Sequence, residues 1–186
     1  MLALLEAADR LANSSNELLK RTWRRYRPIL YLAADSGMRP QEYLALSKSS
    51  LRKDGVLLTR IDGSGHEISV TKTPSGRRFI EISPDVMDMV RHYAEKHASD
   101  NSYDLVFPAS NGKWLCRRNW QRRGFNVACL EAKLVETVQE NGEAVERPEV
   151  PPIRFAAFFA SMHIEKGTNL KKASNAHGGT QTSKQH

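Results

Sequence analysis

The sequence contains little cysteine and no long apolar run. Its 186 residues include two cysteines, Cys116 and Cys129, which lie outside any zinc-type spacing and are expected to be reduced thiols. No apolar stretch approaches the roughly 18 residues that a membrane span needs, so no membrane partner is predicted. Residues 1–20 carry Glu6 and Asp9 and lack a basic leader. A secretory signal peptide is therefore not expected, and a cytoplasmic protein is predicted.

Motifs for cofactor chemistry are also missing. There is no phosphate-cradling glycine loop of the Walker type, no dinucleotide fingerprint and no Ser-His-Asp arrangement. The histidines form no pair at ligand spacing; they are His66, His92, His97, His163, His177 and His186. We therefore predict no metal and no cofactor.

Positive charge is abundant. The formal net charge is +7 and the isoelectric point is near 9.6, and much of the excess falls in blocks of one sign. The first block contains Lys20, Arg21, Arg24, Arg25 and Arg27, and the second contains Lys113, Arg117, Arg118, Arg122 and Arg123. Trp114, Trp120 and Phe125 are interleaved with the second block. A solvated basic face is one interpretation, but separate blocks favour a surface that contacts phosphates, with double-stranded DNA as the partner.

Hydrophobic periodicity predicts a mostly helical α+β domain with a small three-stranded antiparallel sheet between residues 56 and 83. The expected strands are 55–62, 66–71 and 77–83, separated by turn residues. Helices are expected at 2–12, 17–34, 41–50, 85–98, 117–134, 155–167 and 169–177. Ser83 is the expected cap of the helix at 85–98. Residues 104–113 are strand-like, and 135–152 form an acidic connection that could include a hairpin.

Arg39 lies in "SGMRPQEYLALSKSSL", at an expected tight turn before a helix. A rigid guanidinium beside a helix N-terminus favours a bound phosphate, although Arg39 could equally be a structural arginine paired with Glu42. This stretch resembles the first arginine box of the tyrosine recombinases, the phage-integrase family. "VTKTPSGRRFIEIS" resembles the family's β-hairpin lysine motif. The resemblance implies that Arg39 and Lys72 are catalytic, with Lys72 the general acid that protonates the leaving 5′-oxygen.

A third stretch, "FFASMHIEKGTNLKK", resembles the family's helix after its second arginine. Three boxes in family order imply that residues 1–186 form one catalytic-like domain. The family's separate N-terminal core-binding domain is expected to be absent.

The third box departs from the family's pattern. An ungapped alignment on "FFAS" puts Ala156 at the second arginine, Ala157 at its neighbouring histidine and Ile153 at the preceding His or Lys. Gly179 falls at the later histidine, and the nucleophilic tyrosine would fall beyond His186. A rival register uses Arg154 as the second arginine, but it requires an insertion inside a helix. The resemblance thus implies an incomplete site.

In the family, a tyrosine hydroxyl attacks a DNA phosphodiester and forms a 3′-phosphotyrosyl link without a metal. The resemblance therefore implies integrase-type recombination of phage or mobile-element DNA, with this chain expected to be inactive in cleavage. It is compatible with a homo-oligomer assembled on DNA. Two alternatives stay open: a non-catalytic DNA-binding or regulatory remnant of the fold, and a basic helical module that binds RNA or protein.

Overall fold

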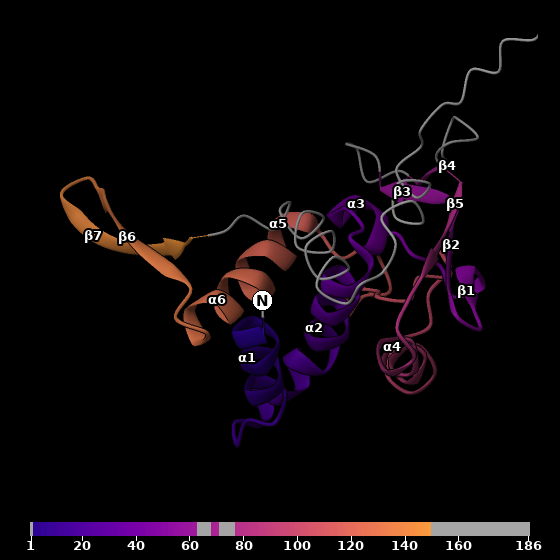
Figure 1. The fold of residues 1–186 in the computed structure, drawn as a ribbon, viewed down its shortest axis with the longest axis horizontal. Helices are drawn as coiled ribbons and strands as arrows, with labels where there is room; N and C mark the ends of the chain where they lie inside the picture. The colour runs from indigo at the N-terminus through magenta and orange to yellow at the C-terminus, as the bar shows by residue number, and fades with distance from the viewer. Residues whose placement is uncertain (1, 63–67, 71–76, 150–186) are drawn as a thin grey trace, which may run out of the picture.

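A computed structural model describes residues 2–62, 68–70 and 77–149. Helix α2 (Glu17–Ser36) contacts α1 (Leu2–Ala12) and α4 (Pro84–Lys96), and Figure 1 shows it running through the middle of the domain. Its apolar face, which includes Trp23, Ile29 and Leu32, is fully buried. Helical spacing of these residues explains why α2 forms the centre of the core.

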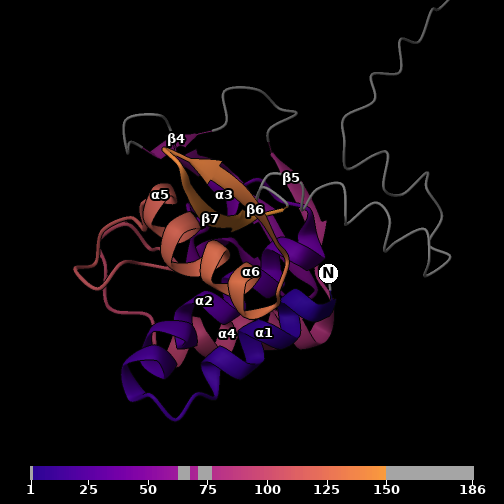
Figure 2. The same ribbon diagram turned by 90° about the vertical axis from the view of Figure 1, so that its left-hand side faces the viewer.

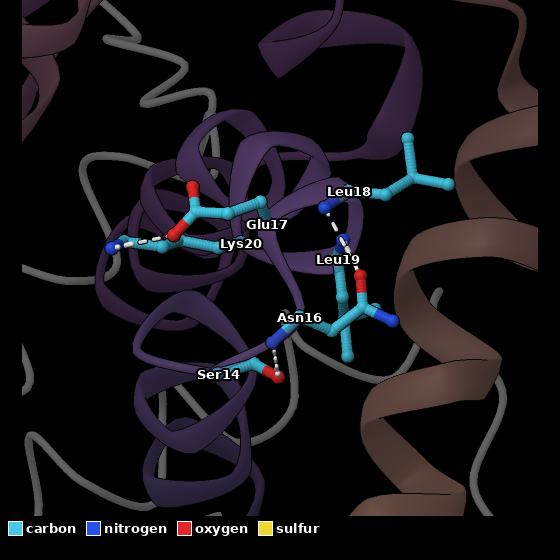
Figure 3. A network of polar contacts seen from close by, with 6 residues as sticks. All are labelled: Ser14, Asn16, Glu17, Leu18, Leu19 and Lys20. Carbon is cyan, nitrogen blue, oxygen red and sulfur yellow. Dashed lines mark hydrogen bonds and ion pairs between the residues drawn. The ribbon is translucent and has the colours of Figure 1, made fainter.

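The start of α2 is fixed by local hydrogen bonds (Figure 3). The Asn16 Oδ1 atom accepts from the backbone N–H groups of Leu18 and Leu19, at 3.0 and 3.1 Å. Ser14 Oγ accepts from the Asn16 N–H at 3.2 Å. Two of the free donors at the helix end are thereby satisfied, and the first basic block begins on an ordered helical turn.

The remaining helical segments complete the core. Helix α3 (Pro40–Tyr43) is one turn long, and the 3₁₀ turn η1 spans Lys48–Ser50. Helix α5 (Arg117–Trp120) continues through a π-helical turn, η3 (Gln121–Phe125), into α6 (Asn126–Glu131). α6 lies against α1, while η3 reaches α2. Figure 2 shows α1, α2, α4 and α6 as a helical layer on one side of the domain.

The described strands form three antiparallel units. The order β1-β2-β5 makes a three-stranded sheet from β1 (Leu51–Arg52), β2 (Gly55–Leu58) and β5 (Arg78–Glu81). Strands β3 (Arg60–Asp62) and β4 (Ile68–Val70) form a separate ladder. Strands β6 (Val135–Glu140) and β7 (Glu143–Pro148) form a hairpin, which projects from the helical layer in Figure 1.

The predicted fold class is confirmed, and so is a hairpin in the acidic connection. The predicted meander is different in detail. The first expected strand is divided into β2 and β3, and the middle one, as β4, pairs with β3 outside the three-stranded sheet. None of the helices in the described ranges is long and apolar enough to cross a membrane.

Two further predictions need correction. The helix expected at 41–50 ends at Tyr43, because the chain then pairs with residues 104–106: Lys48 N–H donates to Asp104 O at 2.7 Å, and Val106 N–H donates to Leu46 O at 2.8 Å. Ser83 does precede α4, but its hydroxyl does not cap that helix. It donates instead to Asp35 Oδ1 at 2.9 Å.

Candidate nucleic-acid interface

Arg39 sits at the end of a rigid turn that follows α2. Gly37 closes α2 in the left-handed conformation, with φ of 63°, which a glycine adopts without steric cost. Met38 is buried, and its N–H donates to Ser36 Oγ at 3.1 Å. Arg39 itself is exposed. The turn therefore holds the Arg39 backbone in place while its side chain faces solvent.

Glu42 fixes this turn to the sheet. Its carboxylate is buried and accepts from the Arg39 N–H at 2.8 Å, while Arg78 Nη2 donates to both of its oxygens at 3.0 Å. The ion pair expected as an alternative, between Arg39 and Glu42, is thus replaced by a pair with Arg78. Among the described residues the Arg39 guanidinium has no carboxylate partner. Its charge is available to a phosphate.

Sequence reasoning assigned no role to Arg78. The residue lies on β5, 36 positions after Glu42, and only the pairing of β5 with β2 brings it to the Arg39 turn. The sequence offered one indication of such a partner: Glu42 follows Arg39 by one turn, and a carboxylate needs a cation once it is buried.

Because α3 is only one turn long, its dipole adds little to anion binding at Arg39, and the charge of Arg39 is the main attraction for an anion.

A buried aromatic pair links the Arg39 turn to the second basic block. Trp120 Nε1 donates to the Tyr43 hydroxyl at 3.0 Å, and both residues are fully buried. Burial raises the pKa of Tyr43, an effect that the Trp120 hydrogen bond and the charge of Arg117 partly oppose. The Tyr43–Trp120 hydrogen bond therefore joins α3 to α5, the helix on which Arg117 lies. Figure 2 shows α3 and α5 close together, in agreement with this contact.

Gly124 makes the π-helical turn possible. A Cβ atom at this position would lie 2.3 Å from Trp120 Cζ3 and 2.4 Å from Cε3. The indole cannot move away easily, because it is buried and held by Tyr43. The turn carries Arg122 and Arg123, both exposed, so a packing requirement determines how these two cations are presented.

The two predicted basic blocks differ in the structure. All five members of the second block are exposed, and none has a carboxylate partner among the described residues: Lys113, Arg117, Arg118, Arg122 and Arg123. In the first block, only Arg21 and Arg24 are both exposed and without a carboxylate partner among the described residues.

The other members of the first block are engaged within the chain. Lys20 pairs with Glu17 at 3.3 Å, and Arg27 pairs with Asp9 at 2.5 Å. Arg25 is half-buried, donates to Pro108 O at 3.2 Å and lies over the Tyr26 ring. These three side chains therefore have partners within the chain, and DNA contacts by Lys20 and Arg25 stay predictions.

Several predicted positions fall outside the described residues. They are Lys72, Ile153, Arg154, Ala156, Ala157 and Gly179. The structure joins α3, which follows Arg39, to α5, which carries Arg117, through the Tyr43–Trp120 hydrogen bond. The exposed cations beside this contact define the candidate interface. In the described part of the chain, no group of three or more His, Cys, Asp or Glu side chains could hold a metal ion.

No protein-family model and no curated protein sequence matches the chain. Solved structures do resemble it. XerA recombinase superposes with a TM-score of 0.63 at 15% identity, covering 94% of this chain and 50% of the other. The Tn1549 transposon integrase in complex with circular intermediate DNA gives 0.64 at 14% identity, covering 90% and 54%. XerH recombinase bound to its difH substrate before cleavage gives 0.61 at 17% identity, covering 94% and 44%.

This chain has the fold of a tyrosine recombinase catalytic domain. It spans about half the length of the solved recombinases that it matches. The recombinase-like fold places Arg39 in the turn between α2 and α3 and joins it, through Tyr43 and Trp120, to the basic helix.

Proposed function

We propose that this recombinase-like domain binds duplex DNA through phosphate contacts made by Arg39 and the second basic block. One observation carries the proposal: the Tyr43–Trp120 contact joins α3 to a helix with exposed Arg117, Arg118, Arg122 and Arg123. Arg39, at the start of α3, is exposed and pairs with no carboxylate of the described residues. The biological context is integrase-type recombination of mobile DNA, with residues 1–186 acting as a catalytic-like domain. The DNA partner named for the Tn1549 integrase and for XerH supports this choice.

The chemistry of the interface suits a phosphodiester. An arginine presents planar paired donors to phosphate oxygens and stays charged at all accessible pH values. Arg39 is held at its backbone by Glu42, so the turn that carries it needs no ordering when a phosphate binds. Contacts of this kind position a protein on DNA without selecting a base sequence. We therefore infer that affinity depends weakly on sequence and that Lys72, where the family resemblance puts a general acid, adds to the same phosphate site.

Single charge removals test the proposal. Arg39→Gln and Arg117→Gln should each weaken binding of a labelled mixed-sequence duplex by roughly three- to tenfold at low salt. Lys53→Gln is the matched control, because it also removes one positive charge. Lys53 is exposed in the turn between β1 and β2. Fluorescence anisotropy gives the three affinities. Equal losses of affinity in all three variants would mean that only the net charge of the protein matters, and this result would refute the proposed interface.

A duplex RNA of the same sequence distinguishes the partner class. Groove geometry and 2′-hydroxyl contacts differ between the two duplexes. A protein that binds duplex DNA through this interface should therefore prefer DNA when the two compete. Preferential binding of the RNA would support the alternative of a basic module for RNA.

We infer that the chain does not cleave DNA covalently. The family alignment puts Ala156 and Ala157 where an arginine and a histidine would stabilise the phosphorane, and each lost donor of this kind costs roughly a hundred- to a thousandfold in rate. The chain's five tyrosines are Tyr26, Tyr31, Tyr43, Tyr93 and Tyr103. Burial raises the pKa of Tyr31 to about 12, helped by its hydrogen bond to Asp9, and burial also raises the pKa of Tyr93. Raised pKa values disfavour the phenolate that would attack phosphorus.

The test is a denaturing gel after incubation with nicked duplex DNA. No protein–DNA adduct is expected from the unmodified chain, nor from Ala156→Arg with Ala157→His, which should gain only phosphate affinity. An adduct from the unmodified chain would overturn the inference. It would also favour the register in which Arg154 is the second arginine.

A further inference from the structure

Within residues 2–62, 68–70 and 77–149, the β6–β7 hairpin is held to the domain at its base. Leu134 N–H donates to Cys129 O at 2.9 Å, and Glu149 N–H donates to Leu134 O at 3.2 Å. The tip is a two-residue turn with positive φ at Asn141 and Gly142, 51° and 86°. None of its strand residues is buried. Local turn chemistry therefore forms the hairpin, while an isolated two-stranded ribbon is only marginally stable in water.

One face of this hairpin combines acid with apolar surface. Opposite residues share a face in an antiparallel pair, and the register places Val138 opposite Val145 and Glu140 opposite Glu143. The valines are half-buried, and Glu136, on the same face, is exposed. Arg147, opposite Glu136 on the same face, pairs with Glu140. Glu136 and Glu143 remain exposed on this face, so it keeps a net negative charge that a cationic partner would complement.

The first turns of α2 offer the complementary surface. Leu18 is 75% exposed, and Arg21 follows it by three residues, which places both on one side of the helix. Arg24 is exposed one turn further on, and neither arginine has a carboxylate partner among the described residues. Lys20, by contrast, is paired with Glu17, and Figure 3 shows Leu18 pointing away from that pair.

We propose that the β6–β7 hairpin of one copy docks on the first turns of α2 of a second copy. Val138 and Val145 cover Leu18, while Glu136 and Glu143 meet Arg21 and Arg24 across the contact. Duplex DNA is the wrong partner for this face because glutamates repel phosphates.

The two surfaces are not joined within one copy, since Leu18 stays exposed and the valines are only half covered. They are also different patches, so the contact is head-to-tail and can link successive copies. This inference does not require the DNA-binding proposal.

Charge reversal on each surface, followed by mixing, tests the contact. A hairpin variant carries Glu136→Lys and Glu143→Lys, and a helix variant carries Arg21→Glu and Arg24→Glu. All four side chains are exposed, so circular dichroism should report an unchanged fold. By sedimentation at low salt without DNA, the wild type should self-associate, and each variant alone should associate at least about tenfold more weakly.

A mixture of the two variants should associate again, because the basic hairpin of one meets the acidic helix of the other, and the two unreversed surfaces also complement each other. Leu18→Ser should weaken association of the wild type without changing its charge. Three results would each overturn the proposal: a wild type that stays monomeric at its highest soluble concentration, single variants that associate like the wild type, or a mixture that does not recover association.

Discussion

Glu42 is the residue on which the geometry of Arg39 depends. It receives one hydrogen bond from the Arg39 backbone and two from Arg78, while its side chain is 6% exposed. A buried carboxylate needs such partners because leaving it unpaired costs several kcal/mol. The same contacts join α3 to β5, so a single side chain couples the candidate phosphate site to the sheet.

Replacing this carboxylate by an amide should be costly. Glu42→Gln keeps the volume but leaves Arg78 without its counter-charge, and we expect the free energy of unfolding to fall by about 3 kcal/mol. Urea denaturation measures the change. Glu17→Gln is the control, because its exposed pair with Lys20 should be worth less than about 1 kcal/mol. Equal losses in the two variants would contradict the role given to Glu42.

At the residue scale, the sequence predicted the turn that carries Arg39 but not the contacts that hold this turn. The arginine lies in a recognisable local motif, whereas the choice between Glu42 pairing with Arg39 or with Arg78 depends on a strand contact between residues far apart. Ser83 illustrates the same limit. Its position predicts a helix cap, yet Asp35 of α2 competes for its hydroxyl. In both cases a tertiary partner determines the side-chain contact.

At the scale of elements, the spacing of apolar residues predicted those described helices that bury one face against the core, such as α1, α2 and α4. The exception is the segment after Tyr43, where Leu44, Ala45 and Leu46 are all buried in succession. Burial alone does not exclude a helix, because α2 also buries Leu32, Ala33 and Ala34 in succession. The helix ends because hydrogen bonds to residues 104–106 replace the helical ones. Likewise, the alternation of residues 55–62 indicates strand but does not reveal the break at Thr59 between β2 and β3.

Gly124 allows an element-level prediction in which two effects oppose each other. In an ordinary helix interior, Gly→Ala stabilises by about 1 kcal/mol. Here the added Cβ would collide with the buried Trp120 ring, and overpacking of a core typically costs about 1–3 kcal/mol. We expect Gly124→Ala to destabilise the fold in urea denaturation and to weaken DNA binding by displacing Arg122 and Arg123.

Asn119→Ala is the comparison for this variant, because Asn119 is exposed on the same helical segment. This substitution should raise the free energy of unfolding by a few tenths of a kcal/mol. A stabilised Gly124→Ala variant would mean that η3 accommodates a side chain. The proposed coupling between packing and the basic surface would then be wrong.

At the scale of the whole molecule, the fold follows from an apolar core that α2 shares with α1 and α4, flanked by a small sheet. Composition predicted a surface for polyanions but could not divide its cations into those bound internally and those free. The structure makes that division: Arg25 and Arg27 stabilise the core, while the second block remains exposed. Identical residue types thus have different roles because of what packs beside them.

The salt dependence of DNA affinity tests the central claim most directly. If Arg39 and the five members of the second basic block each contact a phosphate, the logarithm of the association constant should fall with the logarithm of salt concentration with a slope of about −5.4. Arg122→Gln should reduce the magnitude of that slope by about 1, and Lys53→Gln should leave it unchanged. Anisotropy titrations on one mixed-sequence duplex at several salt concentrations give all three slopes. A slope near zero, or the same slope for all three proteins, would contradict a phosphate-binding surface built on Arg39 and the second basic block.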